Sequence, residues 1–127
     1  LAAMYAELNR TVIAQLVHEF YDEVRRDPEL QPIFDAAIGG NWEPHLERMV
    51  EFWSTVMLAT HEFQGNVYGT HMQLGGVVPD HFQRWLELFD ATARRLFTPE
   101  LADEFLLVAR RIAASLQYGF FGRVEVH

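Results

Sequence analysis

The segment LNRTVIAQLVHEFYDEV, residues 8–24, carries the clearest secondary-structure signal in the chain. Its apolar residues recur at helical spacing, which places them on one face of an α-helix. Two arginines and an aspartate follow, and cations suit the negative C-terminal end of a helix. Pro28 then disfavours helix in the residue before it. The segment therefore predicts a helix with one buried face: Leu8, Val12, Ile13, Leu16, Val17, Phe20, Tyr21 and Val24.

The same spacing recurs in three later segments. One helix is expected to follow Asn41, a favourable N-cap residue, and to run to Met57. Two more are expected over 80–97 and 99–119, with Thr98 as the N-cap of the last helix and its final glycine as the stop. Because no segment alternates in the way a strand does, the predicted fold class is all-α.

Two connections separate these helices. Residues 28–40 contain prolines and are expected to form a short connector that presents Ile33 and Phe34 to the interior. Residues 60–79 carry scattered glycines and little periodicity, which predicts a long loop. Loops of this length in a small domain are usually functional or disordered, so this one is a candidate ligand-binding segment.

The composition limits the functions open to the chain. Its 127 residues are expected to form a single domain, 1–127. Eighteen acidic residues against ten arginines give a net charge of −8, which disfavours nucleic acids and anionic membranes as partners. Cysteine is absent, which excludes thiol chemistry and covalent c-type haem attachment. Because no apolar run has the length of a membrane helix, we expect a soluble cytoplasmic protein.

The six histidines match no zinc-protease or di-iron motif. His18 and His61 begin a zinc-protease pattern, but the second histidine that the pattern needs is missing from both. The glutamates of di-iron bundles, the serine elbow of hydrolases and the glycine loops that bind nucleotides are absent too. We expect His18 and His61 at the surface, and we expect His81, at a helix start, to pack or to cap.

One polar pattern in the predicted interior needs an explanation. Tyr21 and Trp85 carry polar tips on the inward faces of two helices, and His45 lies at the head of an apolar face. A buried O–H or N–H group without a partner costs about 1–3 kcal/mol, so these tips bond either a ligand or backbone carbonyls. Three apolar residues follow His45 on its face and are expected to point inward with it: Met49, Phe52 and Val56.

Several motifs occur in a fixed order: Phe20-Tyr21; Asp27-Pro28-Glu29-Leu30-Gln31-Pro32-Ile33-Phe34; Trp42…His45-Leu46…Phe52-Trp53-Ser54; Gly65-Asn66…His71…Leu74; and His81-Phe82…Trp85-Leu86…Phe89. Together, over about residues 9–118, they closely resemble the third group of truncated haemoglobins. Gln31 stands where that group usually has glycine, and Val67-Tyr68 stands where it usually has Pro-Met.

The resemblance implies a shortened globin fold, in which helices pack two over two around one non-covalent haem b. By position, His71 would be the proximal ligand of the iron, and Tyr21, His45 and Trp85 would lie on the distal side. Arg48 would reach a haem propionate. The full set of implied haem contacts is Phe34, Arg48, Met49, Phe52, Trp53, Leu74 and Phe89.

The implied function is reversible, high-affinity binding of small haem ligands: O₂, CO, NO or cyanide. Donors on Tyr21 and Trp85 would retain such a ligand, which argues against bulk oxygen transport and for ligand retention, sensing, or redox chemistry with nitric oxide or peroxide. Turnover as a nitric oxide dioxygenase or peroxidase would need a reductase that the sequence does not identify. The alternative from a different class is a haem-free helical interaction module with structural histidines.

Overall fold

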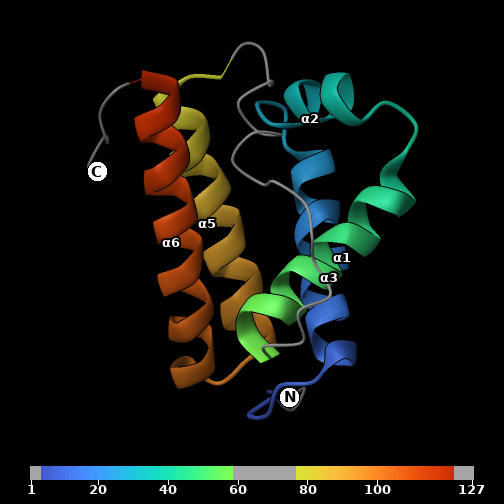
Figure 1. Cartoon of the computed structure of the whole chain (residues 1–127), viewed down its shortest axis with the longest axis vertical. Coiled ribbons are helices and arrows are strands. Elements are labelled where there is room, and N and C mark those ends of the chain that lie inside the picture. The colour runs from blue at the N-terminus through green and yellow to red at the C-terminus, as the bar shows by residue number, and fades with distance from the viewer. Residues whose placement is uncertain (1–3, 59–76, 122–127) are drawn as a thin grey trace.

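The structure, a computed structural model, describes residues 4–58 and 77–121, and these form five α-helices (Figure 1). In chain order the helices are α1 (Arg10–Arg26), α2 (Gln31–Ile38), α3 (Trp42–Leu58), α5 (Pro79–Leu96) and α6 (Pro99–Phe121). Within the described residues, extended pairing is limited to one bridge between Tyr5 and Phe97. The all-α prediction is confirmed. None of these helices is long and apolar enough to cross a membrane.

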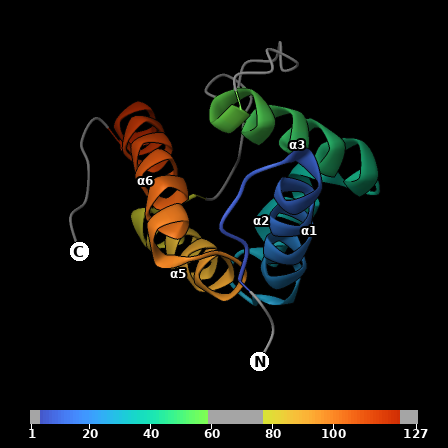
Figure 2. The ribbon, with the colours of Figure 1, turned by 90° about the horizontal axis from the view of Figure 1, so that it is seen from below.

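The helices are arranged as two packed pairs. α1 packs against α3 and also contacts α2 and α5, whereas α5 packs along α6. Figure 2 shows α1, α2 and α3 gathered on one side of the molecule and α5 and α6 on the other. Because only Phe97 and Thr98 join α5 to α6, these two helices run antiparallel. The pairs α1–α3 and α5–α6 give the expected two-over-two arrangement.

Helix α1 forms where the sequence predicted it. Asn9 begins the helix, since its side-chain oxygen accepts a hydrogen bond of 3.0 Å from the backbone N–H of Val12. Two arginines occupy the last turn, and Asp27 ends the helix in an extended conformation. The predicted inward face is buried from Val12 to Val24, whereas Leu8 lies before the helix and is only half-buried.

Residues 28–40 are not a connector, and that prediction was wrong, because they contain α2. The carboxylate of Asp27 closes the turn that leads into this helix, since its Oδ1 accepts backbone N–H bonds of 2.9 and 3.0 Å from the second and third residues after it. A proline fits the first turn, and Gly39 ends the helix at a φ of 64° that favours glycine. Phe34 is buried, so it faces the interior as expected.

Helix α3 presents two different faces. Its fully buried residues are Trp42, Val50, Trp53 and Ser54. The face that begins at His45 is only half-buried, and Val56 on that face is 43% exposed. The prediction that Val56 points into the core was therefore wrong. At this position α3 borders an open groove shared with α6, and no described helix covers it.

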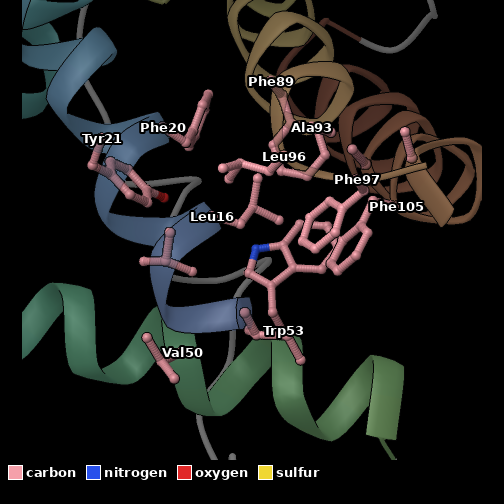
Figure 3. Packing of buried hydrophobic residues seen from close by; sticks show 14 of the residues in the cluster. Leu16, Phe20, Tyr21, Val50, Trp53, Phe89, Ala93, Leu96, Phe97 and Phe105 are labelled. Atoms are coloured by element: carbon pink, nitrogen blue, oxygen red, sulfur yellow. The ribbon is translucent and has the colours of Figure 1, made fainter. Parts of the chain in front are cut away.

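Helices α5 and α6 build the closed part of the core. The rings of Phe97 and Phe105 stack with centroids 4.9 Å apart, and the indole of Trp53 on α3 lies beside them (Figure 3). The expectation that Gly119 stops α6 was wrong, because the helix continues to Phe121. A glycine inside a helix costs only about 1 kcal/mol, which the packing of α6 outweighs.

Candidate functional site

An apolar pocket opens where the five described helices meet. Aromatic and aliphatic carbon makes up most of its wall, with few polar groups, as is typical of cofactor and ligand sites. The structure thus brings together side chains from distant parts of the sequence. Six of the predicted site residues line this pocket: Tyr21, Phe34, Met49, Phe52, Trp53 and Trp85.

Tyr21 of α1 places a hydroxyl group on the wall of the pocket. Its ring centroid lies 4.9 Å from those of Phe20 and His45, and about 6 Å from those of Phe34 and Trp42. Burial raises the pKa of the phenol well above its ordinary value, so the hydroxyl keeps its proton. No described residue forms a hydrogen bond with it. This proton is therefore available to a ligand in the pocket.

Trp53 and Trp85 add two N–H donors to the same wall. Their indoles stack on the ring of Phe89, with centroid distances of 5.2 and 5.7 Å, which fixes their orientation. Neither N–H meets an acceptor among the described residues, whereas the indole of Trp42 donates to Asp35 Oδ1 at 3.3 Å. Donors left open on an apolar wall are satisfied when a polar ligand binds there.

His45 lies beside the pocket rather than in its wall. The half-buried imidazole meets the ring of Tyr21 edge to face at 4.9 Å and that of Trp42 at 5.7 Å. The guanidinium of Arg25 in turn lies 4.6 Å from the centre of the Trp42 ring. This stack, which the sequence did not predict, supports Tyr21 from the side of α3. Arg48, one turn further along α3, is exposed.

His81 performs the capping role expected of it. Its Nδ1 accepts a hydrogen bond of 3.1 Å from the backbone N–H of Val78, at the start of α5. In the neutral imidazole the proton then resides on Nε2. His81 also lines the pocket, a position that the sequence did not predict.

An ion pair between Arg84 and the buried carboxylate of Asp27 fixes α5 relative to α1 and α2. Arg84 Nε donates to Asp27 Oδ2 at 2.5 Å, and the side chain of Asp27 is 2% exposed. Burial alone would raise the pKa of Asp27, but hydrogen bonds from Arg84, Leu30 and Glu29 outweigh it and hold that pKa below its ordinary value. Arg84 directly precedes Trp85, so this ion pair constrains where the indole enters the pocket.

The remaining predicted residues lie elsewhere. Phe89 is 1% exposed and lies beneath the pocket, in contact with both Trp53 and Trp85. His71 and Leu74 lie outside the described residues, so their roles stay predictions. The sequence reasoning missed the wall formed by α6, whose helical spacing indicated core packing alone. The residues of that wall are Ile112, Ala113 and Leu116.

Comparison with known proteins reveals close similarity to one group of haemoglobins. The chain is 30% identical over 116 residues to "Group 3 truncated hemoglobin ctb" of Campylobacter jejuni subsp. jejuni serotype O:2, a match covering 89% of this chain and 91% of the relative. The crystal structure of a group III truncated haemoglobin from Campylobacter jejuni superposes with a TM-score of 0.89 at 29% identity, covering 94% of this chain and 96% of that one. No family model matches. The predicted shortened globin fold is confirmed.

Proposed function

This chain belongs to the group 3 truncated haemoglobins, and from that premise we propose that its pocket binds one haem b non-covalently and that the loaded protein binds O₂ and other small ligands reversibly. One observation carries the proposal. Tyr21, Trp53 and Trp85 direct O–H and N–H donors without a partner among the described residues to the wall of an apolar pocket. An empty apolar interior gains nothing from such donors, whereas a polar ligand bound there satisfies them.

The residues of the pocket fit a flat aromatic cofactor. Phe34, Met49 and Phe52 offer apolar surface from α2 and α3, and Phe82 faces them from α5. Haem, when bound, supplies an iron that takes up a small ligand. His71 is proposed to hold that iron from the proximal side through a neutral imidazole nitrogen, with Leu74 against the ring and Arg48 at a propionate.

Tyr21 and Trp85 are proposed to retain the ligand on the distal side. The Tyr21 hydroxyl keeps its proton at neutral pH, as does an indole N–H, and both residues line a pocket whose wall is mostly apolar. Hydrogen bonds to a ligand that carries negative charge contribute about 1.5–3 kcal/mol each, and 1.4 kcal/mol is about tenfold in affinity. His45 is proposed as a further distal residue, acting through its edge contact with the Tyr21 ring.

Tight retention favours some functions over others. A protein that releases O₂ slowly is a poor carrier for bulk transport, so we favour ligand storage, sensing, or redox chemistry with nitric oxide or a peroxide. Repeated turnover in such chemistry needs an electron donor, and we propose a reductase partner for it. CO, NO and cyanide are the expected alternative ligands, since each is small enough for the same distal space.

Absorption spectroscopy of the purified protein with added haemin tests the cofactor proposal. We expect a strong Soret band in the wild type, and its loss or marked weakening in His71→Ala. An unaltered haem spectrum in His71→Ala would overturn the proximal assignment. A folded, colourless wild type that does not respond to haemin would overturn haem binding itself and favour the haem-free interaction module.

Stopped-flow measurement of O₂ dissociation tests the distal donors. Tyr21→Phe and Trp85→Phe are each expected to speed dissociation about tenfold or more, because each removes one donor to the ligand. Trp42→Phe is the matched control, since the Trp42 indole already donates to Asp35 and lies outside the pocket wall. Equal dissociation rates in the wild type, Tyr21→Phe and Trp85→Phe would refute the distal assignment.

A further inference from the structure

A continuous chain of aromatic rings leads from the pocket to the surface. It begins at the indole in the pocket wall, passes through the closed core and ends at a phenol 38% exposed to solvent. Every link lies within the range of direct ring contact, and several rings are nearly parallel, with interplanar angles of 20°, 24° and 11°. In order, the rings are Trp85, Phe89, Trp53, Phe105, Phe97 and Tyr5, with centroid separations of 5.7, 5.2, 5.7, 4.9 and 6.2 Å. Figure 3 labels the four inner rings, Phe89, Trp53, Phe105 and Phe97.

The surface end of this chain is held in place by the backbone. The N–H of Tyr5 donates to the carbonyl of Leu96 at 2.8 Å, and its own carbonyl accepts from the N–H of Thr98 at 3.0 Å. The phenol donates to Gln15 Oε1 at 2.8 Å and is open to water. A phenol that gives up an electron must also lose its proton, and solvent is available to take the proton here.

Tyr21 lines the pocket itself, and its phenol lacks such an outlet to solvent. It is 5% exposed, burial raises its pKa, and no described residue accepts its proton. Oxidation of Tyr21 would leave a charged phenol in an apolar environment, which is strongly unfavourable. An electron is therefore drawn more easily from Tyr5, through Trp53 and the two phenylalanines between them, than from the nearer phenol.

We infer that this chain of rings is a route for single electrons and that Tyr5 is a surface site oxidised by a hydroperoxide reduced in the pocket. The inference rests on the proposed function, because the cofactor there is what reduces the peroxide. It gives the protein a second site, at the far end of the core from the pocket, where a small reducing substrate such as a phenol would be oxidised without entering the pocket.

The reaction balances with hydrogen peroxide as the oxidant. One peroxide takes up two electrons and two protons and gives two molecules of water. Two Tyr5 phenols supply these, each losing one electron through the chain of rings and one proton to solvent, and two neutral phenoxyl radicals remain. Without an added reductant, radicals on two molecules join through one new carbon–carbon bond, and the displaced ring hydrogens move to the oxygens. The product is a dityrosine-linked dimer.

Mapping dityrosine by peptide mass spectrometry tests the route. Protein loaded with haemin, verified by its Soret band, is treated with hydrogen peroxide and then digested, and the same protein without haemin serves as the blank. We expect Tyr5–Tyr5 cross-links in the loaded wild type, their complete loss in Tyr5→Phe, and no change in Tyr118→Phe. Tyr118 is the matched control because it is 66% exposed and belongs to no ring contact in the chain of rings.

The control separates conduction through the core from attack by oxidants in solution. Random attack favours the more exposed phenol, so cross-links at Tyr118 in place of Tyr5 would overturn the route. Phe105→Leu, which removes one ring and leaves both phenols, should lower the yield of the Tyr5 cross-link, and a yield equal to that of the wild type would overturn the route through this ring. If Phe105→Leu fails to fold, the cross-link patterns of Tyr5→Phe and Tyr118→Phe test the route without it. A missing Soret band reports failure of the proposed function, whereas a Soret band without Tyr5 cross-links overturns the route only.

Discussion

One continuous face of α5 shows two kinds of interior. Phe82 and Trp85, near the start of the helix, are half-buried and line the pocket. Phe89, Ala93 and Leu96 continue the same face toward its end and are buried, at 1%, 0% and 8% exposure. We call the part of the interior around Phe82 and Trp85 the pocket half, and the part around Phe89, Ala93 and Leu96 the closed half. Helical spacing is the same in both halves, so only the presence of packing partners distinguishes them.

The two halves also treat their aromatic rings differently. In the closed half, Phe97 and Phe105 stack at 4.9 Å and are fully buried, so side chains alone fill the space. In the pocket half, Tyr21 and Trp85 keep polar atoms on the wall without a partner among the described residues. Side chains alone fill the closed half, whereas the pocket half keeps hydrogen-bond donors open for the proposed ligand.

The same truncation in each half gives the largest expected difference. Phe105→Ala should lower the free energy of unfolding by about 3–5 kcal/mol, because a fully buried ring leaves a cavity in a rigid core. Phe82→Ala, at the half-buried pocket wall, should cost clearly less in the haem-free protein. Urea unfolding followed by circular dichroism measures both. Equal losses would contradict the division of the molecule into two halves.

The sequence predicted the long helices because their ends and faces follow local rules. Asn9 before α1 and the prolines that begin α5 and α6 mark helix ends in any context. Helix α2 was missed because it has only eight residues and no side-chain cap of its own, and because it follows a turn that the side chain of Asp27 closes. An aspartate placed before a proline-containing turn was the available signal.

The site was predicted less completely than the fold. The resemblance implied that Tyr21 and Trp85 lie near each other, and both line one pocket, but periodicity alone left their partners open. The α6 wall was missed, since the spacing of Ile112 and Leu116 is the same for a core face and for a pocket face. The position of α3 across from α6 decides whether this face of α6 packs into the core or lines a pocket, and that position depends on tertiary packing.

The ion pair between Arg84 and the buried Asp27 gives the next largest effect. Asp27→Asn should lower the free energy of unfolding by about 1–3 kcal/mol, because it removes the charge that Arg84 binds. Asp103→Asn is the matched control, since Asp103 binds Arg94 Nη2 at 2.6 Å but is 67% exposed. Solvent screens that pair, so we expect no measurable change. A similar loss in both variants would show that the burial of Asp27 does not increase the contribution of its ion pair to the free energy of unfolding.

The contribution of Asp27 should also depend on pH. Its pKa is lower in the folded protein than in the unfolded chain, where the ordinary value is about 3.9. The stabilisation is therefore fully present above that ordinary value and is lost as the pH falls through the folded pKa. The difference in stability between wild type and Asp27→Asn should shrink across this acidic range. A difference that stays constant there would assign it to packing instead.

Two buried hydroxyl groups give the smallest expected change in stability and the sharpest test of the comparison. Ser54 Oγ on α3 is fully buried, lies outside the pocket wall and has no hydrogen-bond partner among the described residues. The hydroxyl of Tyr21, a residue of the pocket wall, also has no partner among the described residues. Removing either group as Ser54→Ala or Tyr21→Phe should leave the haem-free protein as stable as the wild type, or more stable by up to about 1 kcal/mol, because neither hydroxyl returns the cost of its burial. Thermal unfolding then cannot tell the two apart, but O₂ dissociation from the loaded protein can. Faster release in Tyr21→Phe alone identifies its hydroxyl as one kept for a ligand, whereas faster release in Ser54→Ala as well would show that the boundary between the two halves is drawn in the wrong place.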